Sequence, residues 1–271
     1  MGVATENNGV LSASIVMNQV AAGEEAHRCV VVALPNAAPV WVGTLHASLS
    51  NGSHHLIVDR RPSAAELIGT AEECSPTMAG DDTRLLIAQQ HETQLALPSG
   101  VAYRLEARQR IFLQLHYINT TDKPETITGK VELNVMPDGA MPAEAKSIFA
   151  GATDISLAPQ QAGLASYFAQ PVAAGATARH VFALTSHTHQ LGIRSIIERV
   201  ASRDAPESTP IHESLNWSEP PLTVFDKPLD FTGSDGLRLT CNYMNTTTRT
   251  VHFGTATTDE MCFMWLYYYE N

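Results

Sequence analysis

Apolar residues in this chain gather in short runs that end at turn-forming residues. The runs include RCVVVAL, VWVGTLHASL, HHLIVD, RIFLQLHYIN, RHVFALTSH, LRLTCNYM and MCFMWLYYY, which are rich in Val, Ile, Leu and aromatic residues. Gly, Pro, Asn and Asp separate them, as in PNAAP, NTTDKP and MPDGAMP. Many short strands between turn signals are typical of β-sandwiches and barrels. Helical periodicity is weak and limited to SAAELI and RLLIAQ, each enough for a turn or two, so we expect an all-β protein.

A break in this pattern divides the chain. The stretch VMPDGAMPAEAKS, residues 135–147, holds two prolines, a glycine and few apolar residues, and strand-rich blocks flank it on both sides. Linkers of this composition commonly separate domains. We therefore place a boundary near residue 138 and expect two β-sandwich domains, residues 1–138 and 139–271.

The composition supports packed cores and argues against some partners. Hydrophobic residues make up 44% of the 271 residues and charged residues 17%. The net charge of −11 argues against nucleic acid or an anionic membrane as a partner. No run of about 18 apolar residues occurs, so we expect no transmembrane segment. The start, MGVATENNGVLSASIV, lacks a basic segment followed by an apolar one, so we expect no signal peptide in this chain.

The four cysteines are Cys29, Cys74, Cys241 and Cys262. None forms a C-x-x-C pair, which argues against a zinc ribbon or a thioredoxin motif. One pair lies early and one late, which fits two disulfides and an oxidising compartment. Four buried free thiols, as in cytosolic proteins, are the alternative that composition leaves open.

The chain has eleven histidines, and their spacing points to metal binding. His187 and His189 are two residues apart in a strand-like run, so their side chains point to the same face and can share one ion. Chance alternation on a solvated face is the alternative for an isolated H-x-H. His54 and His55 are neighbours, which share an ion only where the strand bends or bulges, and Asn51-Gly52 precedes them.

Two further residues have both a structural and a ligand interpretation. His116 lies in the apolar run LQLHY, where a histidine is commonly a hydrogen-bonded core residue. Met261 precedes Cys262, so on a strand the two side chains face opposite ways. A methionine on a β-face usually packs in a core, but thioether together with imidazole is a ligand set that selects Cu(I).

Five segments together resemble the copper type II, ascorbate-dependent monooxygenases, which include peptidylglycine α-hydroxylating monooxygenase and dopamine β-monooxygenase. The segments are SNGSHHLIV, FLQLHY, FALTSHTHQLG, LRLTCNYMN and DEMCFMWLYYY. They occur in the family's order and, with Cys29, span most of the chain. The resemblance implies two tandem jelly-roll-like antiparallel β-sandwich domains with a copper-containing cleft between them.

The resemblance also implies two copper ions per chain and their ligands. The ligands implied for the first copper are His54, His55 and His116. The ligands implied for the second copper, where O2 reacts, are His187, His189 and Met261. The disulfides implied by the resemblance are Cys29–Cys74 and Cys241–Cys262. With these disulfides we expect an extracytoplasmic protein.

The activity that the resemblance implies is hydroxylation of a C–H bond with O2. The thioether favours Cu(I) at the second site, and the first site stores an electron. Ascorbate or another one-electron reductant resupplies both sites, and the expected partners are a small-molecule substrate and O2, with the protein a monomer. Gln114 lies two residues before His116 on the same strand face, where the amidating members also carry Gln, so we expect it to support a ligand. A surface glutamine is the alternative.

The sequence departs from the family at the expected substrate-binding positions. Amidating members carry Arg two residues before H-x-H, and Asn and Tyr two and four residues after the methionine ligand. Here these positions are Thr185, Phe263 and Trp265. A site that lacks this arginine loses affinity for the carboxylate of a peptide substrate. We therefore expect the protein to be a poor peptide amidator and to act on a small neutral or aromatic substrate. Packing of both aromatic residues in the core is the alternative.

Three other functions compete with the monooxygenase. A non-catalytic extracytoplasmic copper protein, for storage or delivery, would keep the ligands and lose the substrate site. A blue-copper carrier needs a thiolate beside two histidines, and Cys262 faces away from Met261. A β-sandwich adhesion module with incidental histidines would bind no copper.

Overall fold

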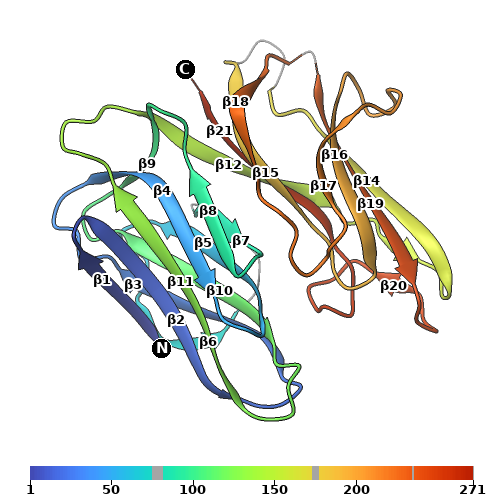
Figure 1. Ribbon diagram of the computed structural model, residues 1–271, viewed down its shortest axis with the longest axis horizontal. Coiled ribbons are helices and arrows are strands. Elements are labelled where there is room, and N and C mark those ends of the chain that lie inside the picture. Colours follow the sequence, from blue (N-terminus) through green and yellow to red (C-terminus); the bar gives the residue numbers. More distant parts are fainter. Residues whose placement is uncertain (75–81, 173–176, 234, 271) are drawn as a thin grey trace. The chain divides into compact units, whose positions relative to one another are not determined.

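The computed structural model describes residues 1–74, 82–172, 177–233 and 235–270 (Figure 1). It contains two compact units, Met1–Lys146 and Ser147–Asn271, hereafter unit 1 and unit 2. Residue 138, where the sequence predicts a boundary, lies in a turn of unit 1 just ahead of strand β12 (Ala143–Ala152). That these units are domains with one copper site each remains a proposal.

Regular elements in the described residues are all β-strands, which confirms the predicted fold class (Figure 1). The two helical turns that the sequence allowed do not form. RLLIAQ lies mostly in β7 (Thr83–Ala88), where Leu86 and Ile87 pair with Val58 and Ile57 and are buried, and SAAELI is a turn that leads into β6. Among the described residues, no helix has the length and apolarity that crossing a membrane requires.

Unit 1 consists of two sheets. Its strands before β12 are β1 (Gly2–Asn7), β2 (Val10–Val20), β3 (Glu25–Ala33), β4 (Val40–Leu49), β5 (Ser53–Arg61), β6 (Ile68–Glu73), β7 (Thr83–Ala88), β8 (Glu92–Ala96), β9 (Val101–Leu105), β10 (Arg110–Ile118) and β11 (Glu125–Val135). One sheet has the order β1-β2-β11-β4-β9, with β8 beside β4, and the other has the order β6-β3-β10-β5-β7. Pairing within both sheets is antiparallel, as expected for a β-sandwich.

The two sheets of unit 1 meet closely at Gly129 of β11. A Cβ added there would lie 3.0 Å from a methyl carbon of Leu56 and 3.2 Å from one of Leu115. Leu56 and Leu115 are fully buried and face this core. Because side chains alternate along a strand, the neighbouring residues His55 and His116 point to the other face of their sheet.

Unit 2 also consists of antiparallel sheets. Its strands after β12 are β13 (Ser156–Leu157), β14 (Gln161–Ala169), β15 (Arg179–His187), β16 (Gly192–Val200), β17 (Pro210–Ser214), β18 (Thr223–Phe231), β19 (Gly236–Asn245), β20 (Val251–His252) and β21 (Cys262–Glu270). The sheets have the orders β12-β21-β15-β18 and β14-β19-β16-β17, and β13 pairs with β20. Leu184, Leu239, Met264 and Leu266 lie in the core that these sheets share.

All four cysteines are paired, in the two disulfides that the family resemblance implies. Cys29 of β3 is bonded to Cys74, which follows β6, and Cys241 of β19 to Cys262 of β21. The Cα–Cα separation is 5.9 Å in each case. The second disulfide joins the two large sheets of unit 2 directly beside Met261, so it constrains the chain at a predicted ligand.

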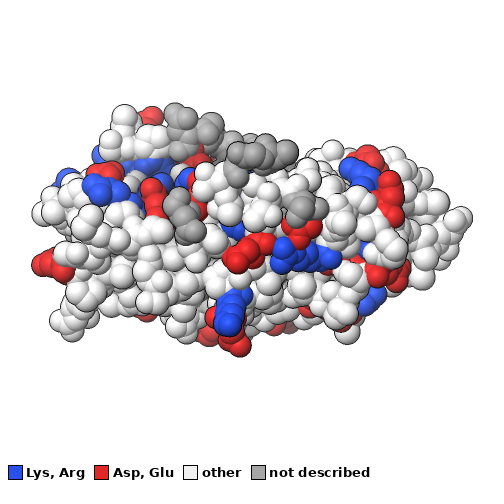
Figure 2. Space-filling view, turned by 90° about the horizontal axis from the view of Figure 1, so that it is seen from above, with Lys and Arg blue, Asp and Glu red and all other residues white. Residues whose placement is uncertain are grey.

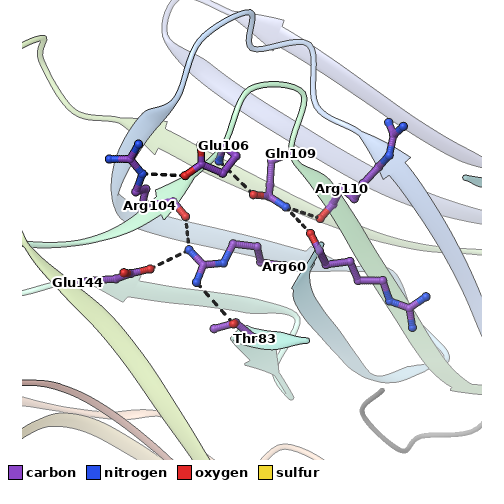
Figure 3. A network of polar contacts seen from close by, with 8 residues as sticks. Arg60, Thr83, Arg104, Glu106, Gln109, Arg110 and Glu144 are labelled. Carbon is purple, nitrogen blue, oxygen red and sulfur yellow. Dashed lines mark hydrogen bonds and ion pairs between the residues drawn. The ribbon is translucent and has the colours of Figure 1, made fainter. Parts of the chain in front are cut away.

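A polar network braces one edge of unit 1 (Figure 3). The Arg60 guanidinium donates to Glu144 Oε1 at 2.8 Å and to the Arg104 carbonyl oxygen, and so ties β5 to β12 and β9. Gln109 Oε1 accepts from the Glu106 amide at 3.0 Å, and its amide nitrogen donates to two carbonyl oxygens. The start of β12 is therefore held to unit 1.

Charged side chains of both signs lie next to one another on the face shown in Figure 2. Blue and red side chains are interspersed there, and neither sign forms a continuous surface. Among the described residues on this face, Lys and Arg form no extended basic surface for a polyanion, in keeping with the net charge of −11.

Candidate metal centres

The register of three strands brings three histidines into one row in unit 1. Strand β10 lies between β3 and β5, and His116 is the direct cross-strand partner of both His27 and His55. Directly opposed residues project to the same face of a sheet and stand about 5 Å apart. The three imidazoles therefore form one group, although they come from positions far apart in the sequence.

A β-bulge adds His54 to this group. His116 of β10 pairs with His55 of β5, but the next residue, Tyr117, pairs with Ser53. His54 is therefore the extra residue of a bulge in β5. This is the irregularity that the sequence required for neighbouring histidines to face one site. The His54 ring centroid lies 5.1 Å from that of His55 and 5.1 Å from that of His116.

His27 is the member of the group that the sequence analysis missed. The nitrogen atoms of His27, His55 and His116 that are able to bind a metal lie within 4.8 Å of one another. The His27 ring stacks on that of His116, with centroids 3.9 Å apart and planes inclined by 20°. The only local signal is its position two residues before Cys29, because the pairing of β3 with β10 cannot be read from the sequence.

A carboxylate orients His116. Its Nε2–H donates to Glu25 Oε1 at 2.9 Å, and the His116 side chain is fully buried. A carboxylate on one imidazole nitrogen fixes the ring and makes the other nitrogen a better ligand. A metal here would therefore be bound through His116 Nδ1, and Glu25 is a second residue that the sequence analysis missed.

Gln114 lies beside the first disulfide. It is the cross-strand partner of Cys29, and its amide nitrogen is 3.8 Å from Cys74 Sγ. It is buried on the same face of β10 as His116, two residues away. A supporting role for Gln114 at the metal site remains a proposal.

In unit 2, His187 and His189 lie at the end of β15. His187 is its last residue and His189 lies two residues beyond the strand, and the two rings are perpendicular with centroids 5.2 Å apart. The Nδ1–H of His189 donates to the Asp259 carbonyl oxygen at 3.1 Å. A metal would therefore meet His189 through Nε2, and the segment that leads to Met261 already contacts this ring.

Glu260 ties the histidine segment to Met261. Its Oε2 accepts from the His189 amide at 3.0 Å and from the Met261 amide at 3.2 Å, and its Oε1 accepts from the Leu191 amide at 2.7 Å. The side chain is fully buried. Burial raises the pKa of Glu260 to about 7, although the three backbone donors act to lower it.

Tyr243 anchors Met261 from the other side. Its hydroxyl donates to the Met261 carbonyl oxygen at 2.6 Å, and burial raises the pKa of this hydroxyl. With Glu260 on its amide and the Cys262 disulfide next in the chain, the backbone of Met261 is held on three sides. Coordination of one copper by His187, His189 and Met261 fits this arrangement and remains a proposal.

The residues expected to bind substrate lie on the same sheet face as His187. Phe263 pairs with His187 and Trp265 with Thr185 across β21 and β15, and the Trp265 ring centroid is 5.9 Å from that of His187. Thr185 Oγ1 donates to the Pro221 carbonyl oxygen at 2.8 Å, so its hydroxyl is used within the fold. The side chains of Phe263 and Trp265 are only 8% and 3% exposed, so both are largely packed within unit 2.

Phe149 and Phe253 extend this aromatic group, and the sequence analysis missed both. The Phe149 ring stacks on Phe263 at 4.5 Å and on Trp265 at 4.3 Å between centroids, and Phe253 lies 5.8 Å from Phe263. Phe149 is 38% exposed and Phe253 37%. Gly151 makes room for the group, because a Cβ there would lie 2.6 Å from the Phe263 ring.

Ser186, next to His187 in β15, faces a buried polar network. Its hydroxyl lies 2.8 Å from His212 Nε2 and 2.8 Å from Ser195 Oγ, and His212 Nδ1 lies 2.8 Å from Thr223 Oγ1. Burial lowers the pKa of His212 to about 4, against the opposing charge of Glu213. The ring is therefore neutral at pH 7 and links β15, β17 and β18.

This network makes a testable contribution to acid stability. Above pH 6.5, His212 is neutral in both the folded and the unfolded chain. Between pH 6.5 and pH 4 only the unfolded chain gains the proton, so the free energy of unfolding decreases as the pH is lowered. The loss attributable to His212 at pH 4.5 is about 2–3 kcal/mol. His212→Gln removes this loss, which urea unfolding of metal-free wild type and variant at pH 7.5 and 4.5 measures. Equal pH dependence in the two proteins would contradict this assignment.

A comparison with known families matches most of unit 2. Residues 165–271 match the sequence model described as the copper type II ascorbate-dependent monooxygenase, C-terminal domain. The matched segment begins in β14 and includes His187, His189 and Met261. No curated protein matches the chain.

Solved structures resemble the chain only distantly. The tandem CBM22-1–CBM22-2 domains of Xyn10C from Paenibacillus barcinonensis share 13% identity, with 100% of this chain and 93% of that chain covered and a TM-score of 0.23. BuGH86 in complex with neoagarooctaose shares 10%, with 98% and 36% covered and a TM-score of 0.21. Vicilin from hazelnut, Corylus avellana, shares 10%, with 90% and 77% covered and a TM-score of 0.17. The family match is more specific: residues 165–271, which hold both the histidine and the methionine segments, match the C-terminal domain of the copper type II, ascorbate-dependent monooxygenases.

Proposed function

We propose that this protein is a copper-dependent monooxygenase that hydroxylates a C–H bond of a small neutral or aromatic substrate with O2 and an external reductant such as ascorbate. The observation that carries the proposal is the family match over the segment in which Glu260 joins His189 to Met261. When bound, copper supplies one-electron redox chemistry with O2. The protein would act outside the cytoplasm, as a monomer, which fits its two disulfides.

The residues of each unit have separate tasks in this proposal. In unit 1, His54, His55 and His116 would bind one copper, with Glu25 orienting the His116 ring. In unit 2, the ring of His189 is oriented by the Asp259 carbonyl and the backbone of Met261 by Glu260. Each donor set fits copper, because imidazole suits it in general and thioether selects Cu(I).

The aromatic group supports an apolar substrate. Phe149, Phe263 and Trp265 form one stacked surface next to His187, and the described residues on this surface carry no cation for a carboxylate. A substrate ring on this surface would gain stacking energy and exclude water from the reacting C–H bond. We therefore expect aromatic substrates to be used and glycine-extended peptides to be poor substrates.

Copper-dependent O2 consumption tests the proposal. The copper-loaded protein is given ascorbate and a panel of small aromatic compounds, with a glycine-extended peptide for comparison. The expected result is a hydroxylated aromatic product that carries one oxygen atom from 18O2. Copper binding without a hydroxylated product from any substrate would contradict the proposal.

A second candidate, a non-catalytic copper protein for storage or delivery, has one observation in its favour. Thr185 and the two aromatic residues replace the polar substrate contacts of amidating members, and their side chains are packed within unit 2. This candidate predicts copper uptake and release to a chelator with no product in the same assay.

The aromatic surface yields a specificity prediction. Phe149→Ala removes the most exposed ring of the stack and is expected to raise the KM for an aromatic substrate by about 2- to 10-fold, with little change in kcat. Steady-state kinetics and copper content measure this. Phe225→Ala is the matched control, because that ring packs against the core of the same unit. An unchanged KM in Phe149→Ala would show that the surface does not meet the substrate.

A further inference from the structure

We infer that His27 is a copper ligand, so that the metal site of unit 1 is built from four imidazoles: His27, His54, His55 and His116. The inference rests on the proposed binding of copper in unit 1. Neither the family match, which begins at residue 165, nor the motifs that carry the resemblance assign a role to His27.

The position of His27 in the sheet supports this assignment. His27 is the direct partner of His116 on the side of β10 opposite His55, so the row of imidazoles is centred on His116. Neighbouring strands are about 4.8 Å apart, which sets the spacing of the side chains in the row.

Distances between the donor atoms are close to those of a metal site. Donor nitrogens of His27, His55 and His116 are at most 4.8 Å apart. Four nitrogens at about 2.0 Å from one tetrahedral ion are about 3.3 Å from one another. Because Glu25 holds the His116 ring, rotation of the His27 and His55 rings about χ2 would have to cover the remaining distance of about 1.5 Å.

Binding requires His27 to leave its stacked position. Imidazole lone pairs lie in the plane of the ring, and the planes of His27 and His116 are inclined by only 20° at 3.9 Å. Two such rings cannot direct lone pairs at one ion, so the His27 ring must turn when the metal binds. His27 is only partly buried, which leaves room for this rotation.

A four-imidazole site has a chemical consequence. Four protein ligands fill a four-coordinate ion and leave no position for an exogenous ligand, as in structural zinc sites. The three-ligand set proposed for unit 2 leaves one position open. Unit 1 would therefore exchange electrons without binding O2, and Glu25 beside His116 would partly offset the positive charge.

The test separates a ligand from a stacking partner. All variants are made in the 271-residue chain that also carries His187→Ala, so that bound copper reports on unit 1 alone. His27→Phe and His27→Ala are each added to this parent. Phe keeps an aromatic ring against His116 and lacks the nitrogen, whereas Ala lacks both. His91→Phe is the matched control. Pulsed EPR and X-ray absorption count the nitrogen ligands, and competition with a chelator measures Cu(II) affinity.

The expected result is the loss of one nitrogen ligand and at least about a 10-fold weaker affinity in both His27 variants, with His91→Phe unchanged. The variants are also expected to bind azide, which the parent does not. A His27→Phe variant with the parent's nitrogen count and affinity would overturn the inference and leave the copper site of unit 1 intact. A parent protein that takes up no copper in unit 1 would overturn both the inference and that part of the proposed function.

Discussion

Replacing His187 by alanine is expected to remove one of the two proposed coppers and to abolish hydroxylation. His187 ends β15 beside His189 and stands across from Phe263, so it lies at both the proposed ligand set and the aromatic surface. Losing an imidazole from a three-ligand site leaves too few donors to hold Cu(I). The rate should fall by at least about a thousandfold, since the metal's contribution to the barrier is several kcal/mol.

Metal analysis after copper loading measures the first effect, and product formation measures the second. His54→Ala should lose the other copper and keep that of unit 2. The matched control is His180→Ala, in the same strand, whose ring contacts the Asp230 carboxylate on the surface. A His187→Ala protein with the full copper content would exclude His187 as a ligand.

Replacing Glu260 by glutamine is expected to weaken the copper site of unit 2 without a change in any proposed ligand. The carboxylate accepts from three backbone amides, two of which belong to His189 and Met261. A glutamine side chain has one acceptor oxygen, so at least one of these buried amides loses its partner. Each such loss costs about 1–3 kcal/mol, and the segments that carry His189 and Met261 are no longer held together.

Copper affinity separates this effect from simple destabilisation. We expect about a 10- to 100-fold loss of affinity at the unit 2 site, weaker copper–sulfur scattering in X-ray absorption, and unchanged copper in unit 1. Glu198→Gln is the control, because Glu198 is also buried in unit 2 and is paired with Arg238 at 2.9 Å. Both variants should unfold at lower urea concentration, but only Glu260→Gln should lose affinity. Equal affinity in the two variants would limit Glu260 to a structural role.

Local sequence was enough for those features that depend on neighbours along one strand. Short apolar runs between turn-forming residues predicted the all-β fold. The H-x-H spacing marked His187 and His189 as one group, and their rings lie together although β15 ends at His187. The neighbouring pair His54–His55 required an irregular strand, and a bulge is present there. RLLIAQ was ambiguous because a short apolar run fits either a helix or a buried strand, and pairing with β5 decided it.

Features that depend on contacts between distant segments were decided by the tertiary structure. His27 joins the histidine row only through the register of β3 against β10, and Phe149 reaches Trp265 only because β12 pairs beside β21. Glu260 contacts His189 because the ends of β15 and β21 meet. Side-chain period along a strand is a local property of the backbone, and so the sequence by itself determined which residues share a face. Which strands become neighbours, and in what register, depends on packing across the whole unit, and so only the tertiary structure decided which of those faces form a site.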